Sequence, residues 1–464
     1  MNITAMVISF VKILAVIAYL YGLLWVMGVK VKKVEIAGKS VNPTLAVRIL
    51  GGIFAFGIIQ LALTDFNGFS VLNNFDSGLL YQACTMTMVA LGLNLIYGFN
   101  GQFSLGQWGF YGIGAYAAAD ITYRWVNGDS RGLIVVGVGV TIGGLIILLI
   151  GKYLRNLRRM PVLSSFTLYL IGSILAGVLA VYAGRLIGPL VDPLLGDSLN
   201  PGPLAQGLAL QVVYFLAVVF AGIFAAEISF LFGLPVLSLG SDYFGIATLG
   251  FSIVIYTLMV NSDTFLPFPE MKGGRGMIGI PKLTTWFWAF SFMMIVIIAM
   301  RNIMRSSSGR SILSVREDEI AAQSMGVDVA GTKLLSFVLG SLFAGLGGGV
   351  YAHFIGFLSP GAFDFLVGFN PLIIIVFGGL GSMTGTITAS FGWIFFLEGM
   401  LREILGKISP EAPSWRFVLY PLTLLLLMLV RPQGLLGSVE WGFLKSKVIP
   451  IRKPDSMEGV MENE

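Results

Sequence analysis

The charged side chains that could do chemistry in this sequence gather in one short segment. Residues 310–319 contain five of them, Arg310, Arg316, Glu317, Asp318 and Glu319, in a chain where charged residues are only 11% of the total. Long apolar stretches flank the segment on both sides, so its charges must lie in water at the edge of an apolar body. We expect a helix that docks a soluble partner through polar contacts; a solvated amphipathic helix without a partner is the alternative.

Other features of the sequence exclude several kinds of chemistry. Cys84 is the single cysteine and His353 the single histidine, which excludes a disulfide within the chain and a Cys-rich or His-rich metal centre. We expect both side chains to pack in the interior. The glycine-rich stretch Phe377–Thr386 has no lysine, and no G-x-x-x-x-G-K-S/T phosphate-binding motif occurs elsewhere. The sequence therefore predicts a chain that is not an enzyme and holds no metal or cofactor of its own.

Composition defines the class of protein that must position the charged segment. Hydrophobic residues make up 56% of the 464 residues, and the mean hydropathy is +0.87. Too few polar side chains remain to cover a soluble domain of this size. The net charge of +5 is dispersed among loops, which is typical of membrane topology, so no nucleic-acid partner is expected. The composition predicts an all-α polytopic membrane protein.

The apolar runs give thirteen candidate spans, each near the roughly 20 residues that cross a bilayer. They lie near 3–27, 45–63, 77–97, 103–122, 132–151, 163–184, 209–232, 242–261, 283–300, 333–357, 363–381, 386–401 and 416–430. We therefore expect a bundle of about 11 to 13 transmembrane helices, with broken or half helices lining a central pathway. The first run is too long for a secretory signal and has no small-residue cleavage site after it, so it should stay attached.

The distribution of Lys and Arg predicts the orientation of the bundle. Alternate loops divide these residues into a set of 19 and a set of 9, with Lys12 left inside the first span. Because cytoplasmic loops carry the excess of positive charge, the N-terminus should lie outside and the C-terminus in the cytoplasm. Segment 310–330 then lies in the cytoplasm, and the chain between 363 and 401 must cross twice, turning at the Gly381–Gly385 loop.

A second block, Leu91–Ala119, combines glycines with uncharged polar residues. Its seven glycines favour close helix packing and also permit a break in a helix. Broken backbone at membrane depth is tolerated only inside protein or beside a wet cavity. The candidate pathway residues beside the expected break are Asn94, Gly101, Gln102, Ser104 and Gly106. The alternative is that this block only holds helices together.

A third block, Leu239–Asn261, should form a helix that Ser241 or Asp242 caps at its N-terminus. The loop that follows, 262–282, is too polar and too rich in Gly and Pro to span a membrane. It is either a surface presented to a soluble partner or a long connection.

Seven sequence blocks in the same order resemble one transporter family. They are the glycine block at 91–119, GSDYFGIATLG, GGRGMIGIP, REDEIAAQSMGV, FAGLGGGVYAHFIGFLSP, IIIVFGGLGSMTG and RPQGLLG, which lie between Leu91 and Ala119 and between Leu234 and Gly437. Together they resemble the LivM-type permease subunits of branched-chain amino acid ABC importers in the bacterial inner (plasma) membrane. The chain departs from that pattern in its N-terminal region and in the apolar stretch between Arg159 and Gly207.

The resemblance implies a division of the chain into three parts. Residues 1–76 would be an N-terminal extension with two transmembrane helices. Residues 77–437 would be the ABC permease transmembrane domain, with a coupling segment at 309–330, and residues 438–464 a cytoplasmic tail.

The resemblance also implies the partners of the chain. A second related permease subunit would share the pathway, two cytoplasmic ABC ATPases would hydrolyse ATP, and an extracytoplasmic binding protein would deliver leucine, isoleucine or valine. The residues that match the coupling loop of such permeases, and that should contact the ATPase, are Arg316, Glu317, Glu319, Ala321, Ala322 and Gly326.

Three alternatives remain open from the sequence. Similar permeases import urea or short amides, and no charged pocket in the sequence selects one solute. An ion-coupled secondary transporter would need ionisable groups inside the bundle, for which Lys12, Glu227 and Glu398 are the candidates. We expect Glu227 and Glu398 to lie near the ends of spans. A channel or membrane scaffold would leave segment 310–330 unexplained.

Overall fold

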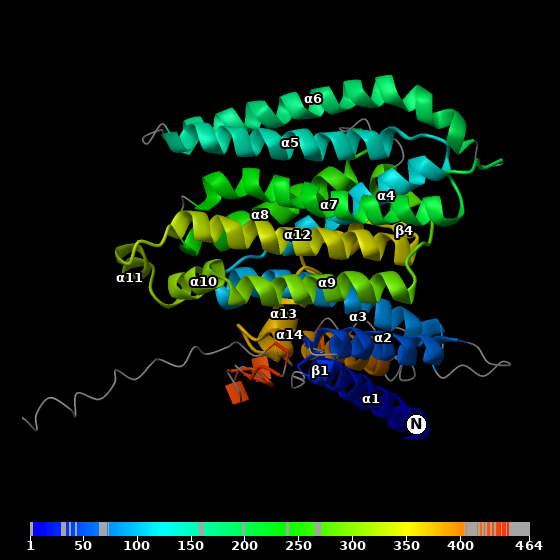
Figure 1. Ribbon diagram of the computed structural model, residues 1–464, viewed down its shortest axis with the longest axis vertical. Coiled ribbons are helices and arrows are strands. Elements are labelled where there is room, and N and C mark those ends of the chain that lie inside the picture. Colours follow the sequence, from blue (N-terminus) through cyan, green and yellow to red (C-terminus); the bar gives the residue numbers. More distant parts are fainter. Residues whose placement is uncertain are drawn as a thin grey trace, which may run out of the picture.

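The computed structural model describes residues 3–28, 34–36, 39–41, 44–64, 72, 74–156, 162–196, 200–237, 241–264 and 271–402, and separate residues between 405 and 444. These residues form fourteen α-helices, most of which lie nearly parallel in one elongated bundle (Figure 1). Two short antiparallel ribbons are the β-structure of the described residues. The predicted all-α polytopic architecture is confirmed.

Ten helices are long. They are α1 (Ile3–Gly28), α2 (Thr44–Leu63), α3 (Asn74–Leu93), α4 (Gln107–Val126), α5 (Arg131–Asn156), α6 (Val162–Leu195), α7 (Gly207–Val236), α8 (Ser241–Val260), α9 (Trp286–Arg305) and α12 (Val329–Ile355). In the described residues, seven helices are long and apolar enough to cross a membrane by length and composition: those that start at Asn74, Arg131, Ser164, Gly207, Tyr243, Trp286 and Val329.

The remaining elements are short. The short helices are α10 (Ser307–Glu317), α11 (Glu319–Ser324), α13 (Phe369–Gly378) and α14 (Met383–Trp393). The π-helical turns η1 (Asn94–Phe99) and η6 (Ile394–Leu401) continue α3 and α14. The 3-10 turns are η4 (Gly273–Arg275) and η5 (Pro360–Phe363), and the ribbons are β1 (Val34–Ile36) with β2 (Lys39–Val41) and β3 (Met277–Ile278) with β4 (Phe357–Leu358).

Helix α12 is the centre of the bundle, packed between α3, α4 and α7. Its glycines permit this contact: a Cβ at Gly345 would collide with Ala225 of α7, and one at Gly348 would collide with the backbone of Tyr111 in α4. Small residues at such crossings let two helix backbones approach closely. The glycine-rich stretch near 345–349 therefore serves helix packing.

Cys84 and His353 are both fully buried, as expected from the sequence. The imidazole Nδ1 of His353 lies 2.7 Å from the carbonyl of Gly349, which can only accept, so Nδ1 carries the proton. The other ring nitrogen then accepts from the hydroxyl of Thr122, at 2.7 Å. Both ring nitrogens are satisfied inside the chain.

The two ends of the bundle can be identified from contacts between distant residues. We call the end with α10 and α11 the α10 end and the opposite one the β3 end (Figure 1). Helix α14 and its continuation η6 run from the α10 end, where the carbonyl of Ser382 accepts a hydrogen bond from Asn94, to the β3 end, where Gly399 of η6 lies against Leu79. Helix α14 is therefore antiparallel to α3.

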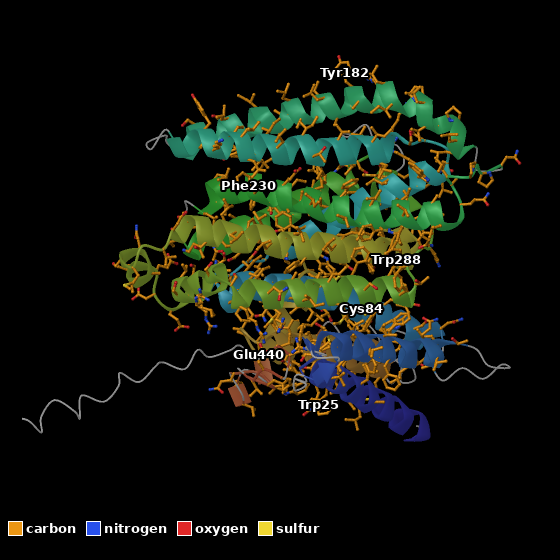
Figure 2. All side chains as sticks on the ribbon, in the orientation of Figure 1. Trp25, Cys84, Tyr182, Phe230, Trp288 and Glu440 are labelled. Carbon is orange, nitrogen blue, oxygen red and sulfur yellow. The ribbon has the colours of Figure 1, made fainter. Side chains whose placement is uncertain are left out.

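The C-terminal part of the described chain returns to the α10 end. Glu440 accepts hydrogen bonds from the backbone nitrogens of Met383 and Thr384, at 2.6 and 3.1 Å, at the start of α14. Figure 2 shows Glu440 on this side of the bundle. Burial raises the pKa of the Glu440 carboxyl above its usual value, although these hydrogen bonds act in the opposite direction. The predicted span 416–430 falls largely outside the described residues, and the chain that flanks it, Gly399 and Gln433, lies at opposite ends.

Three predicted spans differ from the structure. The run at 363–381 is a half helix: α13 has ten residues, about 15 Å, and the chain between 356 and 368, which holds β4 and the 3-10 turn η5, completes the crossing. The turn after it lies at 379–382, because Ser382 caps α14 by accepting from the nitrogen of Gly385. Helix α4 starts at Gln107 rather than 103, because the backbone is non-helical from Gly101 to Gly106. Helix α6 continues to Leu195 and packs outside the core, against α5, with outward side chains such as Tyr182 (Figure 2).

The loop after α8 is folded where it is described. Met277 is buried, and strand β3 pairs with β4 beyond the end of α12. The predicted capping side chains Ser241 and Asp242 lie outside the described side chains, although α8 starts at Ser241. The predicted tail 438–464 is described only for a few residues up to Leu444, so this domain boundary stays a prediction.

Candidate functional site

The chain breaks between α3 and α4. The π-helical turn η1 ends at Phe99, and Gly101 follows with a φ of 78°, a left-handed conformation that favours glycine. The nitrogens of Gly101 and Gln102 bond back to the carbonyls of Tyr97 and Ile96, both at 3.0 Å. The next residues are non-helical until α4 begins at Gln107. The predicted helix break is therefore present.

Polar side chains satisfy the broken backbone from inside the chain. Thr248 of α8 accepts a hydrogen bond from the nitrogen of Leu105, and Ser252 donates to the carbonyl of the same residue, both at 3.1 Å. The buried Ser104 hydroxyl accepts from the nitrogen of Gly106 at 3.3 Å. A Cβ at Gly106 would lie 3.0 Å from the Cβ of Thr248, so α8 packs closely here.

Asn94 ties the break to the turn between α13 and α14. Its amide nitrogen donates to the carbonyl of Ser382 at 3.0 Å and to the hydroxyl of Thr386 at 2.9 Å. Its amide oxygen accepts from the nitrogen of Gly381 at 2.9 Å. Asn94 is fully buried, so in this structure it holds two chain breaks together.

The other candidate pathway residues divide into buried and exposed ones. Gln102 is buried and accepts a hydrogen bond from the amide of Asn100 at 2.8 Å. Gly101 is exposed, as is the ring of Phe103, which the sequence reasoning did not select. The side-chain oxygens of Asn100 and Gln107 are buried with no hydrogen-bond partner among the described residues. Both belong to the uncharged polar residues of the Leu91–Ala119 block that the sequence places beside the break.

The charged segment forms two short helices outside the bundle of spans. The side chain of Ser306 accepts from the nitrogen of Gly309 at the start of α10, and Asp318 accepts from the nitrogens of Ile320 and Ala321, at 2.8 and 3.0 Å, at the start of α11. Such caps stabilise a helix terminus by about 1 kcal/mol. Ile312 and Val315 of α10 are buried against the bundle. The segment is thus a defined structure.

The predicted partner-contacting residues do not share one environment. Glu317, Ala321 and Gly326 are exposed, whereas Ala322 is buried. Glu319 forms an ion pair with Lys333 at the start of α12. Gly326 has a φ of 85° and no atom within 4 Å of the position of a Cβ, so within this chain its backbone conformation, not crowding, favours glycine.

Two large apolar side chains of the segment face outward, and the sequence reasoning missed them. Ile320, in the first turn of α11, is 78% exposed, and Met325, directly after its last residue, is 85% exposed. The sequence could have indicated them, because both are apolar residues in a charged segment that cannot lie in the hydrocarbon. Exposed apolar groups next to charged ones are the composition of a protein-binding surface.

Arg316 connects the charged segment to the helix break. Its Nη1 donates to the carbonyl of Gly98 in η1 at 2.8 Å, and its Cγ would lie 3.5 Å from a Cβ at Gly101. Gly381, in the turn after α13, lies beside the same guanidinium. The structure therefore brings together one predicted docking residue and the predicted break, and the Oε1 of Glu317 lies 3.9 Å from the Nε of the same Arg316.

Comparison of the sequence with known proteins identifies one family. Residues 77–429 match the family described as the branched-chain amino acid transport system / permease component. The chain is 30% identical over 251 residues to the branched-chain amino acid transport permease LivM of Escherichia coli, a match that covers 47% of this chain and 56% of that relative. It is 24% identical over 207 residues to the permease LivH of the same organism, covering 42% and 64%.

A third relative has a different name. The chain is 26% identical over 242 residues to the autoinducer 2 import system permease LsrC of an Enterobacter species, covering 48% of this chain and 66% of the relative. The matched region thus spans little more than half the length of LivM. No solved structure matches the chain significantly.

Proposed function

We propose that this chain, which belongs to the family of branched-chain amino acid transport system permease components, is a translocation subunit of an ATP-driven ABC importer in a bacterial plasma membrane. The α10 end would face the cytoplasm, which leaves the N-terminus outside and agrees with the excess of Lys and Arg in the loops of that side. The solute would be leucine, isoleucine or valine. ATP would bind to partner subunits.

The observation that carries the proposal is the exposure of two large apolar side chains at α11. Ile320 and Met325 are exposed outside the spans, beside the exposed carboxylate of Glu317. An ATPase that covers this surface would bury both apolar side chains. Its movement would reach the bundle through Arg316 and through the ion pair of Glu319 with Lys333. Such coupling requires an element of the bundle that has two arrangements, and both the ATPase and the solute must shift the equilibrium between them.

The helix break is the element that we propose to change arrangement. Arg316 holds the carbonyl of Gly98, and Asn94 holds the turn at 381–382, so a displacement of α10 would act on both. The exposed Gly101 would face the pathway, with Gln102, Ser104 and Gly106 shaping the backbone behind it. The pathway would be shared with a second, LivH-like permease, and an extracytoplasmic binding protein would deliver the solute at the β3 end.

The family and two relatives with matching names support this solute, whereas LsrC carries the name of another import system. The alternative within this class, as in the sequence analysis, is an importer of urea or short amides. Uptake of labelled leucine, valine and urea by proteoliposomes that contain the chain, its sister permease, both ATPases and the binding protein would separate them. Urea uptake without leucine uptake would contradict the assignment.

One observation favours an ion-coupled transporter as a second candidate. The carboxylate of Glu227 lies against Gly143, near the middle of α5, and its Oε1 is buried. This position is deeper than the span end expected from the sequence. Glu398, in η6, lies near the β3 end as expected, and the side chain of Lys12 lies outside the described residues. Intramembrane carboxylates often mark ion pathways.

Uptake driven by different energy sources separates the two candidates. With ATP and the ATPases, we expect uptake that a protonophore does not abolish and that Glu227→Gln leaves largely intact. Uptake by the chain alone under a proton gradient, lost in Glu227→Gln, would instead establish the ion-coupled transporter.

A further inference from the structure

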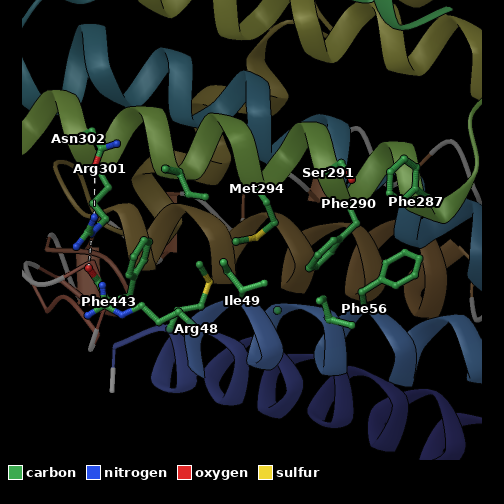
Figure 3. A pocket seen from close by; sticks show the side chains of 14 residues that line it. Arg48, Ile49, Phe56, Phe287, Phe290, Ser291, Met294, Arg301, Asn302 and Phe443 are labelled. Carbon is green, nitrogen blue, oxygen red and sulfur yellow. Dashed lines mark hydrogen bonds between the residues drawn. The ribbon is translucent and has the colours of Figure 1, made fainter. Parts of the chain in front are cut away.

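A groove between α2 and α9 combines an apolar wall with a cluster of arginines. It has a volume of about 530 Å³ and opens on the side of the bundle (Figure 3). Its lining residues are Met27, Arg48, Ile49, Gly52, Ile53, Phe56, Phe287, Phe290, Ser291, Met294, Ile298, Arg301, Asn302 and Phe443. The volume is within the range of roughly 300 to 1,000 Å³ that is typical of ligand pockets.

The groove is longer than one leaflet of the hydrocarbon core. Its lining residues on α9 run from Phe287 to Asn302, which is about 22 Å of helix. Half of the hydrocarbon core is about 15 Å thick. Figure 3 shows Phe56, Phe287 and Phe290 along the part of the groove away from the arginines. The wall could therefore accommodate an acyl chain.

The arginines lie at the α10 end of the groove. Arg48 is in the second turn of α2, and Arg301 and Arg305 are in the last two turns of α9, at the depth of the membrane interface. Arg301 and Arg305 donate to the same carbonyl, that of Phe443, at 2.7 and 2.9 Å. The Phe443 ring lies between Arg301 and Arg48, with their guanidinium carbons 3.8 and 5.9 Å from its centre.

The charges of Arg48 and Arg301 lack an acidic counterpart in the described lining of the groove. None of the described lining residues is acidic, and among the described residues no carboxylate pairs with Arg48 or Arg301. The Nε of Arg48 is buried and has no hydrogen-bond partner among the described residues. Several guanidinium groups at a membrane interface match the geometry and charge of a phosphate.

We propose that this groove binds one anionic phospholipid, with its phosphate on Arg48 and Arg301 and an acyl chain along α2 and α9. Arg48 and Phe443 both lie outside residues 77–429, so the site joins parts of the chain beyond the family match to helix α9 inside it. The lipid would join the N-terminal helices to the transport domain through α9. The inference requires only that the bundle spans a membrane and does not depend on the solute.

Native mass spectrometry of the purified full-length chain tests the proposal. The probes are phosphatidylglycerol and phosphatidylcholine with the same acyl chains, titrated separately in detergent. We expect phosphatidylglycerol to bind about tenfold more tightly, and Arg48→Gln and Arg301→Gln each to weaken it about fivefold, the size of one arginine contact at a membrane surface. Phosphatidylcholine binding should not change in either variant.

Matched variants distinguish the groove from a general effect of charge or bulk. Gly52 lines the groove and has open space around it, so Gly52→Leu should fill the groove and weaken both lipids without harming the helix. Two control variants should bind both lipids like the parent. Gly57→Leu is on the same helix, in equally open space outside the groove lining, and Lys152→Gln removes an exposed charge at the α10 end of α5.

Several outcomes would overturn the proposal. Equal affinity for the two lipids would contradict a phosphate site at the arginines. If Gly57→Leu or Lys152→Gln lost as much lipid affinity as the groove variants, the lipid would not bind in the groove. If Gly52→Leu instead dissociated a dimer of the chain, or its complex with the sister permease, a protein would be the occupant. Arg48→Gln keeps the test decisive if Arg301→Gln fails to fold, because no hydrogen bond to Phe443 is lost with Arg48.

Discussion

Replacing Arg316 by alanine should uncouple ATP hydrolysis from transport, because this side chain is the direct contact between the charged segment and the helix break. Its Nη1 donates to the carbonyl of Gly98 at 2.8 Å, and a hydrogen bond from a charged donor contributes about 1.5 to 3 kcal/mol. The side chain is 39% exposed, so solvent screening favours the lower value. A loss of about 1.4 kcal/mol changes an equilibrium constant tenfold.

The assay is the ratio of solute imported to ATP hydrolysed in proteoliposomes with the complete importer. We expect this ratio to fall about tenfold in Arg316→Ala, with hydrolysis retained and the assembled complex still recovered by affinity purification. Arg310→Ala, an exposed arginine on the same helix, is the control and should keep the parental ratio. The reasoning is refuted if Arg316→Ala transports with the parental ratio, or if Arg310→Ala loses as much.

Four further predictions concern the same machinery. The isolated chain should release no phosphate from ATP, and robust turnover without its partners would exclude the subunit assignment. Glu319→Lys should reduce coupled uptake only mildly, because the Glu319 side chain is 46% exposed and ion pairs open to solvent contribute about 0.2 to 1 kcal/mol. Adding Lys333→Glu should restore uptake; an unrecovered double variant would show that the pair is not the cause. Gly106→Leu should block uptake while membrane insertion persists, because its side chain would press on Thr248, and normal uptake would favour a packing role alone. Gly326→Asn should be tolerated, as Asn adopts left-handed backbone readily, whereas Gly326→Trp should stop transport by obstructing the partner; parental transport by Gly326→Trp would remove the segment from the coupling mechanism.

Much of the fold could be predicted from the sequence because the signals are local. A run of about 20 apolar residues is a property of one stretch of chain, and the predicted boundaries of α1, α2, α7 and α8 agree with the structure within four residues. The helix break beside Gly101 was predicted for the same reason, since glycine and polar residues interrupt the apolar run there. The division of 363–401 into two crossings came from counting charges, and the structure makes the first of them from the half helix α13.

The roles of individual side chains could not be predicted in the same way. Asn94 was expected beside a pathway, yet its three hydrogen bonds all go to residues 381–386 of the same chain. Glu227 was expected near the end of a span but lies against Gly143 in the middle of α5. The sequence pattern indicates which residues are apolar. The long helices of the bundle are apolar around much of their surface, so the pattern does not tell which helix packs against which.

The sequence by itself determined the class of protein, the positions of most spans, the break at Gly101 and the charged segment that must lie in water. Each of these follows from the free energy of transferring a short stretch of chain between water and hydrocarbon. The tertiary structure alone decided that Arg316 bonds to Gly98, 218 residues away, and that Arg48 and Arg301 meet around Phe443. Such contacts depend on which helices pack together, and that choice rests on the shapes of whole helix surfaces, where glycines allow close approach and larger side chains prevent it.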